Sequence, residues 1–215
     1  LVKTDQVIAG SVLKVANSAL FRGLSETTLL RDAMGRIGMK NLRDVLVSVS
    51  MKSKIFEVRG FEPMLAKTWY HSIACAVISA HISKKWPALS ETAFMAGLLH
   101  DIGKVLIVQI LADLEEEERD KTAKRKKAGG IPFDPKKFQI PMLRDVIMPL
   151  MFDEHHSRIG VQVAESWKLP ADLVRAIREH HQPPEGPDHR LVQVVHLANL
   201  YCHHFGIGHD ANPID

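Results

Sequence analysis

The chain has 215 residues, the length of one domain or of two small packed lobes. Hydrophobic residues make up 46% and charged residues 25%, which is typical of a globular protein and excludes collagen-like, coiled-coil and disordered chains. The two longest stretches without Asp, Glu, Lys or Arg, 68–83 and 191–209, contain two and four histidines, so neither predicts a membrane span. With no cleavable signal at its start, the chain is expected in the cytoplasm.

The net charge of +3 comes largely from one segment. Residues 115–137 hold eight Lys or Arg and six Asp or Glu; subtracting them from the totals of 28 and 25 leaves 20 basic and 19 acidic residues. This balance predicts no general basic surface for nucleic acid. Histidine is the unusual residue, with 12 copies, six of them in three doublets: His155-His156, His180-His181 and His203-His204.

The two cysteines, Cys75 and Cys202, lie in apolar helical patterns far apart in the sequence. Two isolated cysteines favour reduced thiols over a disulfide framework. We therefore interpret both as small buried side chains.

Apolar spacings of three and four residues predict helices over 5–20, Leu29–Ile37 and Leu42–Val49. Pro63 is well placed to open a long helix that is apolar on nearly every side as far as Ile82, which predicts a buried central helix. Ser90 is the expected N-cap of a helix that runs to His100, with a bend expected at Gly103.

Residues 113–128 change from Glu-rich to Lys-rich and predict a solvated helix or a flexible hinge. Helices follow at Glu154–Trp167, from Pro170 to a stop at Pro183-Pro184, and at Arg190–Phe205. No convincing strand pattern is present, so the prediction is an all-α protein of roughly nine or ten helices, with histidines at the inward ends of the later ones.

The residues that could carry chemistry are His71, His100, Asp101, His156, His180 and His181. Adjacent residues on a straight helix point about 100° apart, so His100 and Asp101 can share a metal only near a helix end or bend. An imidazole beside a carboxylate makes a mixed nitrogen and oxygen site that suits Zn, Fe or Mn.

Each of these histidines, taken alone, is more commonly a hydrogen-bonded core residue. His71 lies within the buried helix and needs a partner, which a metal or a carboxylate would supply. His156 is in line with Gly160, Val163 and Trp167, and His180 with Leu173, Ala176 and Ile177, so both are expected to face the core. The other histidines, including His81, His203, His204 and His209, are interpreted as surface or capping residues.

The run Gly97-Leu98-Leu99-His100-Asp101-Ile102-Gly103-Lys104, preceded by His71, resembles the HD superfamily of metal-dependent phosphohydrolases. More narrowly, the ordered set of Leu13–Phe21, Ala33–Leu42, His156–Gly160, Trp167–Pro170 and His180-His181 resembles the HDOD family, the HD-related output domains of bacterial signalling. The resemblance runs from about residue 5 to residue 204.

The resemblance implies two helical lobes, an amino-terminal lobe over 1–60 and an HD-like lobe over 61–205, followed by a tail at 206–215. It also implies that His71, His100 and Asp101 bind one metal. Asn199 aligns with the late aspartate of catalytic HD proteins, and an amide lacks the negative charge of that ligand.

The related HD-GYP phosphodiesterases hold a second metal with further histidines, and His156, His180 and His181 occupy matching places. HD-GYP proteins have an acidic metal ligand four residues before the first histidine, and this chain has Lys67 at that position. Their Gly-Tyr-Pro signature is also absent, and residues 182–187 of this chain read Gln-Pro-Pro-Glu-Gly-Pro instead. Lys104 matches a lysine that approaches phosphate in catalytic relatives, and the competing interpretation is a helix-end lysine on the surface.

Three functions stay open at this point. The preferred one is a bacterial signalling output module that acts through signalling proteins and whose degenerate HD cavity is either vestigial or ligand-sensing. The candidate ligands are one or two Fe, Mn or Zn ions and a nucleotide or phosphate. The alternative is a phosphohydrolase acting on nucleotides or cyclic dinucleotides, with Asp101 and Lys104 as catalytic residues. The third is DNA binding through a helix-turn-helix at Leu29–Val49, which few basic residues support.

Overall fold

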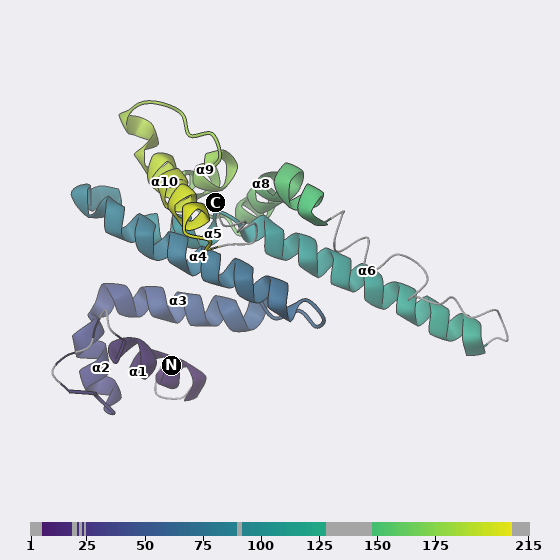
Figure 1. Ribbon diagram of the computed structural model, residues 1–215, viewed down its shortest axis with the longest axis horizontal. Coiled ribbons are helices and arrows are strands. Elements are labelled where there is room, and N and C mark those ends of the chain that lie inside the picture. The colour runs from purple at the N-terminus through teal and green to yellow at the C-terminus, as the bar shows by residue number, and fades with distance from the viewer. Residues whose placement is uncertain are drawn as a thin grey trace. The chain divides into compact units, whose positions relative to one another are not determined.

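The computed structural model describes residues 6–18, 21, 23, 25–89, 92–127 and 148–207, and these residues contain helices and no strand. The all-α prediction is therefore confirmed. The chain forms two compact units, Leu1–Glu57 and Val58–Asp215 (Figure 1). We describe each unit by itself.

The first unit contains α1 (Gln6–Ala16), α2 (Leu30–Ile37) and α3 (Met39–Ile55). Its core gathers one apolar stripe from each helix: Val12 and Ala16, Ala33 and Ile37, and Leu42. The Asn17 side chain donates to the carbonyl of Thr27 and accepts from its N–H, both at 2.9 Å, which fixes the connection between α1 and α2.

A single residue, Gly38, separates α2 from α3, and its φ of 77° is a conformation that favours glycine. The turn of a helix-turn-helix has about three or four residues. Residues 29–49 are therefore a tight helical corner around an apolar core, and its one-residue turn differs from that of the helix-turn-helix considered as the third alternative.

The second unit contains all the candidate site residues. Its elements are α4 (Glu62–Ile82), η1 (Ser83–Lys85), η2 (Pro87–Leu89), α5 (Ala93–Leu99), α6 (Ile102–Lys127), α8 (Met148–Ser166), α9 (Ala171–Glu179), η4 (Pro187–His189) and α10 (Arg190–His204). Helix α4 has Pro63 in its first turn and packs on α5 and α10, while α8 packs on α6 and α9 (Figure 1). Small side chains of α5 and α9 meet α10 in one core cluster, which includes Ala93, Ala176 and Val195.

Several predicted boundaries are wrong by a few residues. Helix α1 ends at Ala16, and α8 begins at Met148, six residues before the predicted Glu154, although Met148 and Phe152 continue its buried face at a spacing of four. Ser90 lies outside the described residues, as does the charged segment after 127.

The bend predicted at Gly103 lies instead at His100-Asp101, between the end of α5 and the start of α6. Gly103 has a different purpose: a Cβ there would overlap the backbone carbonyl of His156 and lie 2.8 Å from the nitrogen of Gly160. A Cβ on Gly97 would likewise lie 2.7 Å from the carbonyl oxygen of Cys75. These two glycines let α6 approach α8, and α5 approach α4, at backbone distance.

Helix α6 changes character along its length. The run Ala93–Glu117 is long and apolar enough to cross a membrane, but 72% of its most apolar window is buried inside the fold, as in the core helix of a globular domain. Further on, Glu116, Glu117, Asp120 and Lys121 are exposed, and Lys121 pairs with Glu117 at 2.9 Å. The predicted helix continues as far as Lys127, and Lys124 on it is exposed as well.

We expect Gly103→Ala to destabilise the protein by roughly 1–3 kcal/mol, because the methyl group must push α6 and α8 apart. Urea unfolding followed by circular dichroism measures this loss. Gly35→Ala is the matched control: nothing lies within 4 Å of its Cβ position in α2, so the free energy of unfolding should stay equal or rise by about 0.5–1 kcal/mol. Equal stability of Gly103→Ala and the wild type would contradict the close approach.

Candidate metal centre

Four separate parts of the second unit bring the predicted site residues together. His71 lies in the middle of α4, His100 and Asp101 occupy the break between α5 and α6, His156 lies within α8, and His180-His181 follow α9. The break is what allows His100 and Asp101 to point to one place, as expected for adjacent ligands. His71, His100, His156 and His180 are each at most 2% exposed, whereas His181 is more open.

Asp101 lies at the centre of the cluster, and its side chain is only 2% exposed. Its Oδ2 lies 2.9 Å from Lys104 Nζ, 3.3 Å from His100 Nε2 and 3.4 Å from His71 Nε2. Its Oδ1 lies 3.3 Å from His156 Nε2 and 3.6 Å from His180 Nε2, yet makes no hydrogen bond. A buried carboxylate oxygen without a donor calls for a positive partner.

The outer ring nitrogens of four histidines are held by backbone carbonyls, which fixes their tautomers. The Nδ1–H groups of His71, His100 and His180 donate to Ile207, Gly97 and Ile177 at 2.7, 2.8 and 2.9 Å. His156 Nδ1–H donates to the carbonyl of Phe152. Each Nε2 therefore carries its lone pair toward Asp101, the arrangement found in metal-ligating histidines.

These lone pairs face one another at short range. The Nε2 atoms of His71 and His100 are 3.1 Å apart, and those of His156 and His180 are 3.4 Å apart. The tautomer of His181 is not fixed in this way, and its Nε2 lies 2.9 Å from that of His156. Neutral imidazoles whose protons all lie on Nδ1 cannot hydrogen-bond to one another through Nε2. A cation between them relieves this conflict, so the residues fit a divalent metal, with His71, His100 and Asp101 as one group and His156, His180 and His181 as another.

The protonation states also suit metal binding. Burial lowers the pKa of His71 to about 4 and that of His180 well below its usual value. Partial burial and the neighbouring His156 lower the pKa of His181 to about 4. Burial alone would raise the pKa of Asp101, but Lys104 and His100 outweigh it and hold that pKa well below its usual range. His71, His180 and His181 are thus neutral imidazoles and Asp101 is an ionised carboxylate at neutral pH, the forms that bind metals.

Lys104 belongs to this cluster. Its side chain is 8% exposed and pairs with Asp101 one helical turn earlier, so the interpretation as a surface lysine is wrong. Asn199 is buried on α10 with a side-chain oxygen that makes no hydrogen bond, and its role as a metal ligand stays a prediction. Trp167 is 44% exposed, so the buried face of α8 does not extend to it as expected.

His203 was missed by the sequence interpretation. It is only partly exposed, its ring centroid lies 5.3 Å from that of His71, and it lines a narrow cleft with Thr68, His71, Asp101 and Lys104. Its spacing of four residues from Asn199 puts both on one face of α10, a signal that could have found it. His81 and His204 are exposed as expected, and His209 lies outside the described residues.

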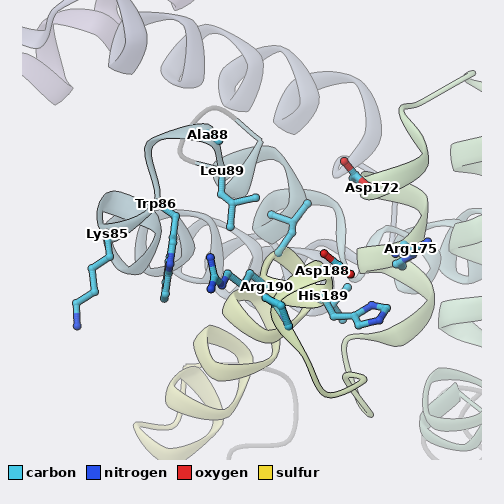
Figure 2. Close-up of a pocket in the computed structure, with 12 residues that line it drawn as sticks. Lys85, Trp86, Ala88, Leu89, Asp172, Arg175, Asp188, His189 and Arg190 are labelled. Carbon is cyan, nitrogen blue, oxygen red and sulfur yellow. The ribbon is translucent and has the colours of Figure 1, made fainter.

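A separate cavity of about 380 Å³ lies among η1, η2, α9, η4 and α10 and shares no lining residue with the histidine cluster. Figure 2 shows the guanidinium of Arg190 beside the ring of Trp86, 5.5 Å from its centroid, with Asp188 and His189 farther along the wall. Its volume is in the range of small-molecule pockets, but six of its twelve lining residues are charged or histidine, whereas such pockets are lined mainly by apolar side chains.

Comparison with known proteins identifies the family. The model of the HDOD domain matches residues 1–131, more than half of the chain. The chain belongs to the HDOD family. The model of the HD domain matches 68–202, the part of this HDOD chain that contains every predicted metal ligand from His71 to Asn199.

Relatives support the fold of this HDOD chain along its whole length. An HDOD domain protein of unknown function from Geobacter sulfurreducens has a TM-score of 0.69 and 23% identity, covering 100% of this chain and 68% of that one. A protein of Shewanella amazonensis SB2B, provisionally described as a metal-dependent phosphohydrolase, has a TM-score of 0.62 and 21% identity, covering 93% and 66%. An uncharacterised protein of Treponema pallidum (strain Nichols) is 27% identical over 207 residues, which are 93% of this chain and 36% of that protein. The chain thus spans about a third of this curated relative's length.

After its metal is removed with a chelator, the protein should become less stable to unfolding as the pH falls from 6.5 to about 4. His71 stays neutral in the folded chain down to about pH 4, whereas in the unfolded chain it protonates near 6.5, so the unfolded state binds more protons in this window and stability rises with pH. Urea midpoints at a series of pH values measure the slope. His71→Gln should flatten it, while His204→Gln, at an exposed histidine, should not; equal slopes in both variants would show that His71 is not the cause.

Proposed function

We propose that this chain is a regulatory HDOD module of bacterial signal transduction, located in the cytoplasm, whose histidine–aspartate centre binds a divalent metal and an anion. In this proposal the module acts by contact with signalling proteins. The observation that carries it is the charge of the centre: four imidazoles lie within 3.6 Å of Asp101, with His181 beside His156, and Asp101 is the single carboxylate in the metal-binding groups of the described residues.

The ligand set favours Fe, Mn or Zn, because imidazole and carboxylate suit these ions. One ion would be held by His71, His100 and Asp101, and a second by His156, His180 and His181. When bound, such an ion lowers the pKa of its water and polarises a phosphoryl oxygen. Lys104 adds a positive charge beside Asp101, so a centre with one ion has a formal charge of about +2 and attracts an anion such as phosphate or a nucleotide.

The positive charge of the centre, which lacks two acidic ligands of its catalytic relatives, argues against efficient hydrolysis. The position of the acidic ligand in HD-GYP proteins is Lys67, whose side chain is exposed on α4, and that of the late aspartate is Asn199. The cleft beside His71 and Lys104 is too narrow for a water-sized sphere, so its side chains must move apart to admit a phosphoryl group. Binding of metal and anion survives these changes more easily than hydrolysis does.

Descriptions of similar proteins agree with a signalling role without assigning it. A protein of Marinobacter aquaeolei VT8, with a TM-score of 0.60 and 19% identity over 98% of this chain and 46% of that one, is provisionally described as a signal transduction protein. The exposed charged face of α6, which includes Glu116, Glu117 and Lys124, is a candidate contact surface for such partners.

The second candidate is a metal-dependent phosphohydrolase acting on nucleotides or cyclic dinucleotides. It is favoured by the burial of Lys104 within 2.9 Å of Asp101, which puts a cation where a phosphoryl group would bind. In that case Lys104 neutralises the developing charge on phosphate and Asp101 orients the attacking water.

Elemental analysis of protein purified without chelator or affinity-tag metal is the decisive experiment. We expect about one or two equivalents of Fe, Mn or Zn per chain, and a loss of most of this metal in His100→Ala, which removes a central ligand. His204→Ala, at an exposed histidine on α10, should retain it. A metal-free wild type that melts at the same temperature with and without added Mn²⁺ would rule out the centre.

A second test separates the two candidate functions. The metal-loaded protein should bind inorganic phosphate or a nucleotide and leave cyclic dinucleotides intact, whereas hydrolysis that disappears in His100→Ala would establish the phosphohydrolase. Asn199→Asp should raise metal occupancy because it adds a negative charge. Unchanged occupancy in this variant would show that position 199 does not contact the ion.

A further inference from the structure

A second group of potential ligands lies beside the histidine–aspartate centre and includes sulfur. Cys75 follows His71 by one helical turn on α4, and Cys202 reaches the same place from α10. The two Sγ atoms are 3.5 Å apart, and Cys75 Sγ lies 3.7 Å from His71 Nε2. The three ligand atoms all lie within 4.8 Å of one another, and none of the three side chains is more than 3% exposed.

These distances match those around one tetrahedral ion. With metal–sulfur bonds of about 2.3 Å and metal–nitrogen bonds of about 2.0–2.1 Å, tetrahedral zinc separates two sulfur ligands by roughly 3.8 Å and sulfur from nitrogen by roughly 3.6 Å. The observed 3.5 and 3.7 Å differ from these values by a few tenths of an ångström. The third distance, from Cys202 Sγ to His71 Nε2, is bounded at 4.8 Å, so metal binding requires these two side chains to move closer together.

The surroundings suit a neutral complex. Ala198 packs with the two cysteines, and Ala74, Ile78 and Ile207 cover them with partly buried apolar side chains. A divalent ion with two thiolates and one neutral imidazole carries no net charge, so it can lie among apolar side chains at low electrostatic cost. Thiolates select soft or borderline ions, whereas the Asp101 centre offers nitrogen and oxygen only.

We infer that His71, Cys75 and Cys202 form a second metal site, for zinc or another thiolate-binding ion, that shares the His71 imidazole with the histidine–aspartate centre. Because His71 Nδ1–H is committed to the carbonyl of Ile207, the ring has one lone pair to give, at Nε2. The two sites therefore compete for His71. The competition rests on the function proposed above, whereas the sulfur site itself does not.

His71 also lines the narrow cleft that contains Thr68 and His203, so this cleft adjoins the sulfur site. The side-chain oxygen of Asn199 is available as a further ligand to either site. It has no hydrogen-bond partner and lies three residues before Cys202, on the same face of α10.

Cobalt titration of the reduced, chelator-treated chain tests the sulfur site. Thiolate-to-cobalt charge transfer gives a near-ultraviolet absorption band that histidine and carboxylate ligands do not produce. We expect this band to saturate in the wild type, to be lost in the Cys75→Ser/Cys202→Ser double variant and to persist in His100→Ala. No band in the wild type, or a band that survives in the double variant, would overturn the inference and show that the two thiols only pack together.

The same variants keep this result separate from the proposed function. Manganese occupancy reports on the histidine–aspartate centre, so it should persist in the double cysteine variant and be lost in His100→Ala. The cobalt band should show the opposite pattern in the same two variants. His71→Ala should lose manganese occupancy and shift the band. A band unchanged in His71→Ala would overturn the shared ligand.

Should the double cysteine variant fail to fold, cadmium NMR of the wild type replaces it. A cadmium nucleus bound by two sulfurs resonates far downfield of one bound by nitrogen and oxygen alone. A downfield signal supports the site, and its absence at saturating cadmium overturns it.

Discussion

The buried carboxylate of Asp101 is the constraint on which the second unit depends. A carboxylate that is 2% exposed is stable in its ionised form only if positive or donor groups surround it. Lys104 supplies one such group at 2.9 Å, and the imidazoles from α4, α5, α8 and α9 turn their nitrogens to the same place. The lone pairs of these imidazoles add to the demand for a cation, so the helices converge on a site that a metal completes.

Glycine makes this convergence possible. Gly97 brings the backbone of α5 against α4 next to Cys75, and Gly103 brings α6 against α8 next to His156. With a side chain at either position, the helices would be held farther apart, and His71 and His100, or Asp101 and His156, could not share a ligand. The geometry of the site therefore depends on the close helix packing that these two glycines allow.

Much of the fold and of the ligand set could be predicted from the sequence, because both follow from local patterns. Apolar periodicity and Pro63 predict α4, and the resemblance to the HD superfamily points to His71 and His100. What was missed depends on neighbours from other helices. The break was predicted at Gly103, two residues after Asp101, and the environment of Lys104 was left open between the phosphate site and the surface. The approach of Cys75 to Cys202, 127 residues apart, and of His203 to His71 follows from how α10 packs on α4.

One lone pair on His71 links the metal chemistry of the two proposed sites. An ion held with Asp101 leaves the centre positively charged beside Lys104, which favours an anion. An ion held with Cys75 and Cys202 is neutral and removes the imidazole that the first site needs. In the proposal, the choice of ion at His71 thus sets the charge of the cleft and with it the affinity for phosphate. A module without turnover could use that difference as its signal, because a change in bound charge alters what the surrounding helices present to a partner.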